Sequence, residues 1–361
     1  MSRLRLAGVL VLIGTLGQGV AQWVVVWLIS WRFGAGAVGA YSVLLAGATP
    51  TFVFTNFSLR NVYLTLPSAP RWRVFLRWRV GGIAVGASVL MCYALVAAPR
   101  WGLVGAMIAL KGSDALLDIA LARVQRSRRM ILLGSLMTAN ALASIVGMAV
   151  VAWLAADVDI MLLVSAAVSL LCAWFAVSRS PTPAEERAAE DASWRLLLVA
   201  GAPLTLTAFL MTAVSSIPVW YLHAASSPSE VGRYTAAAYL VVAANLVGAS
   251  IQTVLLPSYR EVLEHDGSAA LLRNVVRHSR ELAAGVGLAA VVVVGWGDPV
   301  LRLLYGPAFG ARRGELLLLA LAAAFCVLAY LWSTVLLVRT RYVSQAGVAL
   351  ASVLSGAAVV S

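Results

Sequence analysis

The sequence contains little charge and few of the side chains that build catalytic or metal centres. Charged residues make up 12% of its 361 residues, and it has three cysteines, three histidines and a single lysine. The cysteines are isolated in separate apolar stretches, and the histidines lack ligand spacing, so we predict neither a disulfide nor a metal site. A Walker-type phosphate loop is also missing, which excludes ATP hydrolysis by that route. We therefore expect no cofactor.

What the sequence has in abundance is apolar residues. Hydrophobic side chains account for 61% of the chain, and its mean hydropathy is +0.91. A chain of this composition cannot form a water-facing surface, which indicates an integral membrane protein. Apolar runs of about twenty residues, enough to cross roughly 30 Å of hydrocarbon as helix, recur along the sequence.

These runs predict an all-α polytopic membrane protein with about eleven transmembrane helices. Gln18, Gln22 and two tryptophans interrupt the first run, so we interpret it as a retained helix rather than a cleaved signal. The predicted spans are 8–31, 36–58, 80–98, 101–122, 130–155, 159–177, 196–222, 233–257, 281–297, 314–338 and 343–361.

The positive charge is distributed along the chain in a way that predicts orientation. The net charge is +12, but the arginines are spread over short loops, which does not fit a nucleic-acid-binding surface. Nineteen of the 27 basic residues fall on one set of alternate loops and six on the opposite set. By the positive-inside rule, the N-terminus is predicted to be cytoplasmic.

A polar segment divides the chain into two predicted bundles, 1–178 and 196–361. Residues 179–195 combine prolines, acids and arginines and are predicted to form a cytoplasmic linker. The second span of each half opens with Val-Gly-x-Tyr-(Ser/Thr), from Val38 and from Val231. This similarity favours duplication, with two six-helix bundles as parallel repeats, as in alternating-access transporters. A twelfth span is then expected after Ser361, with a second bundle that is naturally one helix short as the alternative.

The fourth predicted span contains charged residues at the depth of the hydrocarbon core, where a charge is unfavourable. It reads KGSDALLD from Lys111, and at 1.5 Å per residue Lys111 lies about 18 Å from Arg123 at the predicted boundary. Helical spacing places Lys111, Asp114 and Asp118 on one face, which Gln125 continues. Each charge toward lipid would cost at least ~2.5–3.5 kcal/mol, so this face is expected to point into the bundle. An intrahelical ion pair and a hydrated cavity are alternative explanations.

Other polar residues fall within the predicted spans. Arg60 follows Asn56 at the end of the second span, and Asn245 and Gln252 lie two turns apart in the eighth. They are candidates to line the same cavity, whereas packing between helices is the alternative for each amide. Arginines and tryptophans alternate over residues 71–79, which predicts an amphipathic interfacial anchor or, as an alternative, a collector of diphosphate groups.

With these residues in view, the sequence resembles the lipopolysaccharide or capsular-polysaccharide biosynthesis transporters, the oligosaccharide flippases of the superfamily that also contains MATE-type antiporters. The resemblance runs from about Thr55 to Phe309. Its pieces are TNFSLRNVYLT, KGSDALLDIALARVQRSRRM, SSIPVWYL with the residues that follow it, and DPVLRLLYGPAF. Trp220 stands near a position where such proteins often carry an arginine.

The resemblance implies a non-enzymatic transporter in the bacterial cytoplasmic membrane. It would flip a polyprenyl-diphosphate-linked oligosaccharide to the outer leaflet by alternating access, with a proton or sodium as coupling ion and polysaccharide-assembly proteins as partners. Arg60 and Lys111 would contact the diphosphate, since cations suit phosphate. Asp114 and Asp118 would tune Lys111 or carry a proton, while Asn245 and Gln252 would meet the glycan. A MATE-like exporter of organic cations is the alternative.

Overall fold

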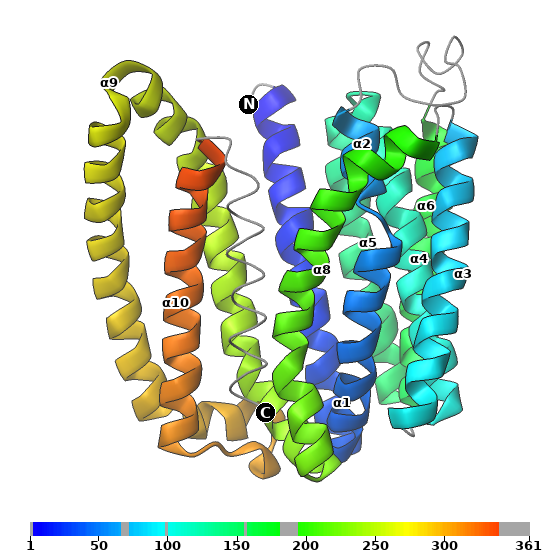
Figure 1. The fold of residues 1–361 in the computed structure, drawn as a ribbon. Helices are drawn as coiled ribbons and strands as arrows, with labels where there is room; N and C mark the ends of the chain where they lie inside the picture. The colour runs from blue at the N-terminus through cyan, green and yellow to red at the C-terminus, as the bar shows by residue number, and fades with distance from the viewer. Residues whose placement is uncertain (1–2, 66–71, 98–99, 155–156, 181–193, 339–361) are drawn as a thin grey trace. The chain divides into compact units, whose positions relative to one another are not determined.

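The computed structural model describes residues 3–65, 72–97, 100–154, 157–180 and 194–338, and within these ranges it contains helices and no strand. Eight stretches are long and apolar enough to cross a membrane, as expected for a membrane-embedded, polytopic protein. The helices, shown in Figure 1, are α1 Arg3–Thr55, α2 Leu59–Thr65, α3 Trp72–Ala97, α4 Trp101–Arg126, α5 Met130–Trp153, α6 Val158–Arg179, α8 Trp194–Ala225, α9 Pro228–Tyr305, the 3-10 turn η1 Pro307–Phe309, and α10 Arg313–Val338.

The chain forms two compact units. Among the described residues, the first contains those up to Arg32 and from Ala40 to Ser226, and the second contains Phe33–Gly39 and those from Ser227 to Val338. The predicted linker lies mostly outside the described residues, as does the predicted span 343–361. Division into two bundles at the linker, and their relation as parallel repeats, stay predictions.

Two of the long helices each consist of two helical limbs that meet at a glycine with a non-helical backbone conformation. Gly34 in α1 has φ 79° and ψ −177°, and Gly267 in α9 has φ 77° and ψ −178°. Only glycine adopts this conformation without strain. Predicted spans 8–31 and 36–58 are thus the two limbs of α1, and spans 233–257 and 281–297 are the two limbs of α9, whose reversal is visible in Figure 1.

The second predicted span ends in a helix break. After Thr55 the chain leaves the helix and re-enters one at Leu59, with positive φ at two residues that are not glycine, Phe57 at 52° and Ser58 at 46°. A left-handed conformation is uncommon for a phenylalanine and marks a site where surrounding contacts hold the backbone. This break places Arg60 on the short helix α2 instead of at the end of a continuous span.

Helix α4 is the centre of the first unit. It contacts α2, α3, α5 and α6, and its residues 119–124 are all buried, which covers more than one full turn. Apolar clusters pack on two of its sides, one with α5 and α6 and the other with α2 and α3. Three of its five charged residues, Lys111, Asp114 and Asp118, fall within 18 residues and keep it out of the eight apolar stretches. The other helices of the unit therefore enclose the charged one.

The second unit is built on the α9 hairpin and α10. Its core contains Tyr259, Leu271 and Val275 from α9 and Leu331 from α10, all 1% exposed or less. An ion pair joins Asp298 and Arg302 at 3.0 Å near the end of α9, and Asp298 also accepts a hydrogen bond from the backbone N–H of Ala311. These contacts fix the turn between α9 and α10.

Candidate functional site

The polar face predicted on α4 exists and remains accessible. Asp114 is exposed and Lys111, Asp118 and Gln125 are half-buried, although most of their neighbours on α4 are buried. Because α4 is otherwise enclosed by helices, these polar side chains border an accessible space. The structure contains these four residues along one face of α4, as the helical spacing predicts.

Asp118 is the centre of this site. Its Oδ1 lies 3.0 Å from Nη1 of Arg60, and its Oδ2 lies 3.0 Å from Nη2 of Arg79. The second terminal nitrogen of Arg60 donates to Oε1 of Gln125 at 3.0 Å. The structure therefore brings the predicted residues Arg60, Asp118 and Gln125 into direct contact. We call this set, with Arg79, the arginine clamp.

Arg79 is a clamp residue that the sequence analysis did not single out. It was included in the segment 71–79 predicted to be an interfacial anchor, and the structure includes it in α3 with 1% of its side chain exposed. Besides Asp118, it donates to the backbone carbonyl of Asn56 at 3.4 Å, within the helix break. The signal was present in the sequence, since Arg79 lies one turn after Phe75 on the face that continues through Gly86 and Leu90.

Asp114 belongs to a second, separate polar group. Its Oδ1 accepts a hydrogen bond from the hydroxyl of Ser169 on α6 at 3.1 Å, and that hydroxyl also lies 3.3 Å from Oδ1 of Asn140 on α5. Ser169 and Asn140 are both buried. Side chains of α4, α5 and α6 thus meet at Ser169, which contacts both Asp114 and Asn140.

Lys111 does not pair with either aspartate. Among the described side chains, no carboxylate oxygen lies within 4.0 Å of its ammonium group. Asp118 is held by two arginines and Asp114 by Ser169, so the intrahelical ion pair considered above is not formed in this structure. Lys111 remains a cation one turn from Asp114 without a direct partner in the described part of the chain.

Two further arginines near the end of α4 contact aromatic rings of neighbouring helices. The guanidinium of Arg123 lies 5.1 Å from the ring centre of Trp72, and that of Arg126 lies 5.2 Å from the ring centre of Tyr63. Arg126 also donates to the backbone carbonyl of Tyr63. These cation–π contacts fasten α4 to α2 and α3 next to the arginine clamp.

The predicted site residues of the second unit contact α10. Oδ1 of Asn245 accepts from the thiol of Cys326 at 2.8 Å. Gln252 donates to the hydroxyl of Ser333 at 2.7 Å and to the carbonyl of Tyr330 at 3.3 Å. Hydrogen bonds of this kind fit the packing alternative for both amides, and their role in cargo binding stays a prediction.

The charges of the first unit favour an anion. Three cations, Arg60, Arg79 and Lys111, meet two acids, Asp114 and Asp118, in and beside the clamp. No cluster of three or more acidic, histidine or cysteine side chains suited to a metal ion is present among the described residues. The arrangement can therefore neutralise one additional negative charge.

Comparison with family models, with curated proteins and with solved structures found no match to this chain.

Proposed function

We propose that this protein is a membrane transporter that flips a polyprenyl-diphosphate-linked oligosaccharide from the cytoplasmic to the outer leaflet of a bacterial membrane by alternating access. The observation that carries the proposal is the excess of cations over acids at an accessible face of an otherwise enclosed helix. The resemblance of the fourth-span sequence to oligosaccharide flippases supports it.

The diphosphate is the part of such a cargo that needs a protein to cross the membrane. Its negative charges cannot enter hydrocarbon unaided, and cations in a low-dielectric surrounding bind phosphate strongly. Lys111 suits this role because no described carboxylate neutralises it directly. A compact ammonium group reaches phosphate as a point charge, whereas the planar guanidinium of Arg60 can contact it with two nitrogens.

The members of the arginine clamp have different roles in this proposal. Arg60 is 29% exposed and can turn toward a cargo, exchanging its bond to Asp118 for one to phosphate. Arg79 is buried and acts as a positioning residue that holds the Asp118 carboxylate in place. Asp114, held by Ser169, is the candidate to carry a coupling proton or to bind sodium.

A transport assay separates the proposal from the antiporter alternative. The purified chain is reconstituted in proteoliposomes with a labelled polyprenyl-diphosphate oligosaccharide in the inner leaflet, and its arrival in the outer leaflet is followed with an impermeant glycan-modifying enzyme. Faster arrival than in protein-free vesicles is expected. Absence of flipping, combined with proton-driven export of an organic cation by the same preparation, would instead identify an antiporter.

Matched arginine variants show whether the clamp is responsible. Arg60→Ala is expected to slow flipping strongly. Arg273→Ala removes the same charge from an exposed position of α9 outside the clamp and is expected to leave the rate unchanged. Equal rates in the two variants would argue against a role for the clamp in transport.

A further inference from the structure

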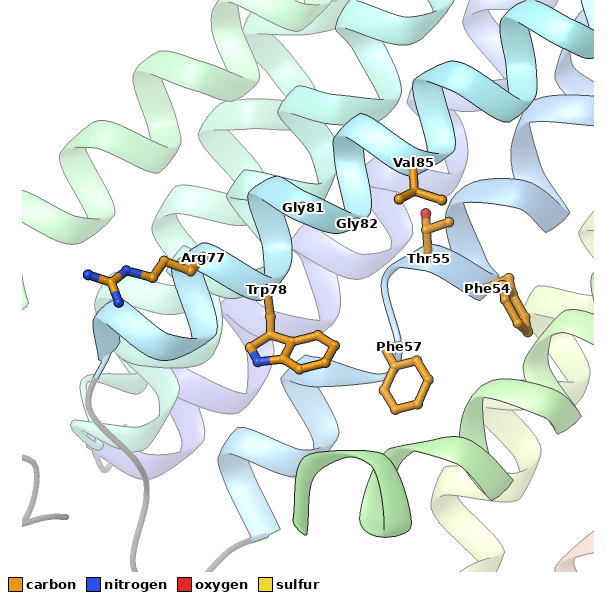
Figure 2. Close-up of a pocket in the computed structure, with 8 residues that line it drawn as sticks. All are labelled: Phe54, Thr55, Phe57, Arg77, Trp78, Gly81, Gly82 and Val85. Carbon is orange, nitrogen blue, oxygen red and sulfur yellow. The ribbon is translucent and has the colours of Figure 1, made fainter. Parts of the chain in front are cut away.

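A second site lies beside the arginine clamp, on a different face of α3. Arg79 points toward α4, whereas Arg77, Trp78, Gly81 and Val85 line a pocket with a volume of about 450 Å³. Its remaining walls are the end of α1 and Phe57 of the helix break. Figure 2 shows the rings of Trp78, Phe57 and Phe54 around this space. We call it the α3 pocket.

The lining of the α3 pocket is suited to a hydrocarbon chain. The exposed atoms that line it are almost all apolar, and two adjacent glycines leave the α3 wall without side chains at its middle. A β-carbon added at Gly81 would meet no atom within 4 Å, so the space beside it is open. Burying a lipid chain against such a surface releases free energy in proportion to the apolar area covered.

One end of the α3 pocket carries a cation. Figure 2 shows the guanidinium of Arg77 extending away from the aromatic rings, toward the start of α3. The side chain is exposed, and no described carboxylate pairs with it. An apolar floor with a cation at one end is complementary to an amphiphile that has a negatively charged head.

The length and direction of the α3 pocket match those of a lipid in one leaflet of a bilayer. Arg77 and Trp78 belong to the predicted interfacial segment, and tryptophan and arginine are typical of that depth. From Arg77 to Val85 the helix extends eight residues, about 12 Å at 1.5 Å per residue. A headgroup at the interface would thus meet Arg77 while its tail followed α3 toward the middle of the membrane.

We propose that the α3 pocket binds an anionic glycerophospholipid of the surrounding bilayer, with its phosphate on Arg77 and one acyl chain along α3 to Val85. Besides Arg77, the only side-chain polar groups in the described lining are the hydroxyl of Thr55 and the indole N–H of Trp78, and no residue of the clamp lines the pocket. These features favour a bilayer phospholipid over the transported cargo. Because Phe57 lines the pocket and belongs to the helix break, a bound lipid also braces the backbone next to Arg60.

Native mass spectrometry of the full chain, released from mild detergent with phosphatidylglycerol or phosphatidylethanolamine, tests this proposal. Retention of one phosphatidylglycerol in preference to phosphatidylethanolamine is expected. Arg77→Gln should weaken phosphatidylglycerol binding about fivefold, as one basic residue near an anionic headgroup contributes. Arg73→Gln, which removes an exposed arginine of α3 outside the pocket, should have no effect.

Gly81→Leu tests whether an acyl chain occupies the pocket, because the leucine side chain would fill the open space and exclude both lipids. Thermal unfolding of the variant checks that it folds, and Arg77→Gln tests the proposal independently if it does not. Equal binding of the two phospholipids, or equal weakening by Arg73→Gln and Arg77→Gln, would overturn the proposal. Displacement of phosphatidylglycerol by a lower concentration of polyprenyl phosphate would assign the pocket to the cargo's tail instead.

Discussion

Arg79 of α3 is buried with its guanidinium 3.0 Å from the carboxylate of Asp118 on α4, and the second oxygen of that carboxylate is held by Arg60. A single acid thus joins two cations from two elements that pack on the same helix. Removal of the acid leaves two positive charges facing each other, one of them out of reach of water.

Asp118→Asn is therefore expected to destabilise the protein. Leaving a buried charge unpaired costs about 3–5 kcal/mol, and we expect a loss at or below the lower end of this range because Asp118 is 36% exposed. The measurement is unfolding of the purified protein in detergent. Asp157→Asn is the matched control, because Asp157 is 62% exposed and its partner Arg100, at 3.6 Å, is 65% exposed. Such surface pairs contribute about 0–1 kcal/mol, so a similar small loss in both variants would refute the burial argument.

Gly82 is expected to be a position of the first unit where a side chain larger than that of glycine does not fit. A β-carbon at this position would lie 2.3 Å from the backbone carbonyl oxygen of Thr55, so α3 or the end of α1 must move to admit it. Gly82→Ala should lower stability by about 1–3 kcal/mol, as overpacking does. Gly81→Ala, one residue away in open space, should be neutral or slightly stabilising. Equal unfolding temperatures for the two variants would show that this contact is not tight.

The reversal of α9 is expected to depend on Gly267. Its φ of 77° with ψ of −178° is strained for any residue with a β-carbon, so Gly267→Ala should cost about 1–3 kcal/mol. Gly285, in the same helix, has no atom near its added β-carbon and no positive φ, so Gly285→Ala should stabilise by about 0.5–1 kcal/mol. Opposite signs in the two unfolding measurements are the expected result, whereas stabilisation by both substitutions would contradict the observed backbone.

Gln252 distinguishes packing from cargo binding. Its two hydrogen bonds to α10 predict that Gln252→Ala lowers stability by about 1–3 kcal/mol, at roughly 0.5–1.5 kcal/mol for each bond. If its role is packing, transport per folded molecule should stay at the wild-type level. Loss of flipping with unchanged stability would instead support the predicted contact between Gln252 and the glycan.

Much of the helical pattern follows from the sequence because a span needs only length and apolar composition. Ten of the eleven predicted spans overlap described helices along most of their length, and the eleventh lies outside the described residues. The break at Phe57 and Ser58 was not predicted, since neither residue type favours positive φ and tertiary contacts hold the backbone there. The reversals at Gly34 and Gly267 were expected only as loops between spans.

The candidate site was predictable along one helix but not between helices. Helical spacing identifies the face of Lys111, Asp114, Asp118 and Gln125, because 3.6 residues per turn is a local property. It does not identify the partner of Asp118, which depends on how α2 and α3 pack against α4. The sequence analysis therefore gave Asp118 the role of tuning Lys111 or carrying a proton, whereas the structure pairs it with Arg60 and Arg79.

The central claim, that Lys111 receives the anionic headgroup of a transported lipid, is tested most directly by the flipping rate of its variants in proteoliposomes. Lys111→Ala should reduce flipping of the diphosphate-linked oligosaccharide at least about tenfold, which corresponds to about 1.4 kcal/mol. Lys111→Arg should keep part of the rate, because it retains the charge with a different geometry. Both variants should fold and insert like the wild type, since no described carboxylate pairs with Lys111. Flipping by Lys111→Ala at the wild-type rate would contradict the claim.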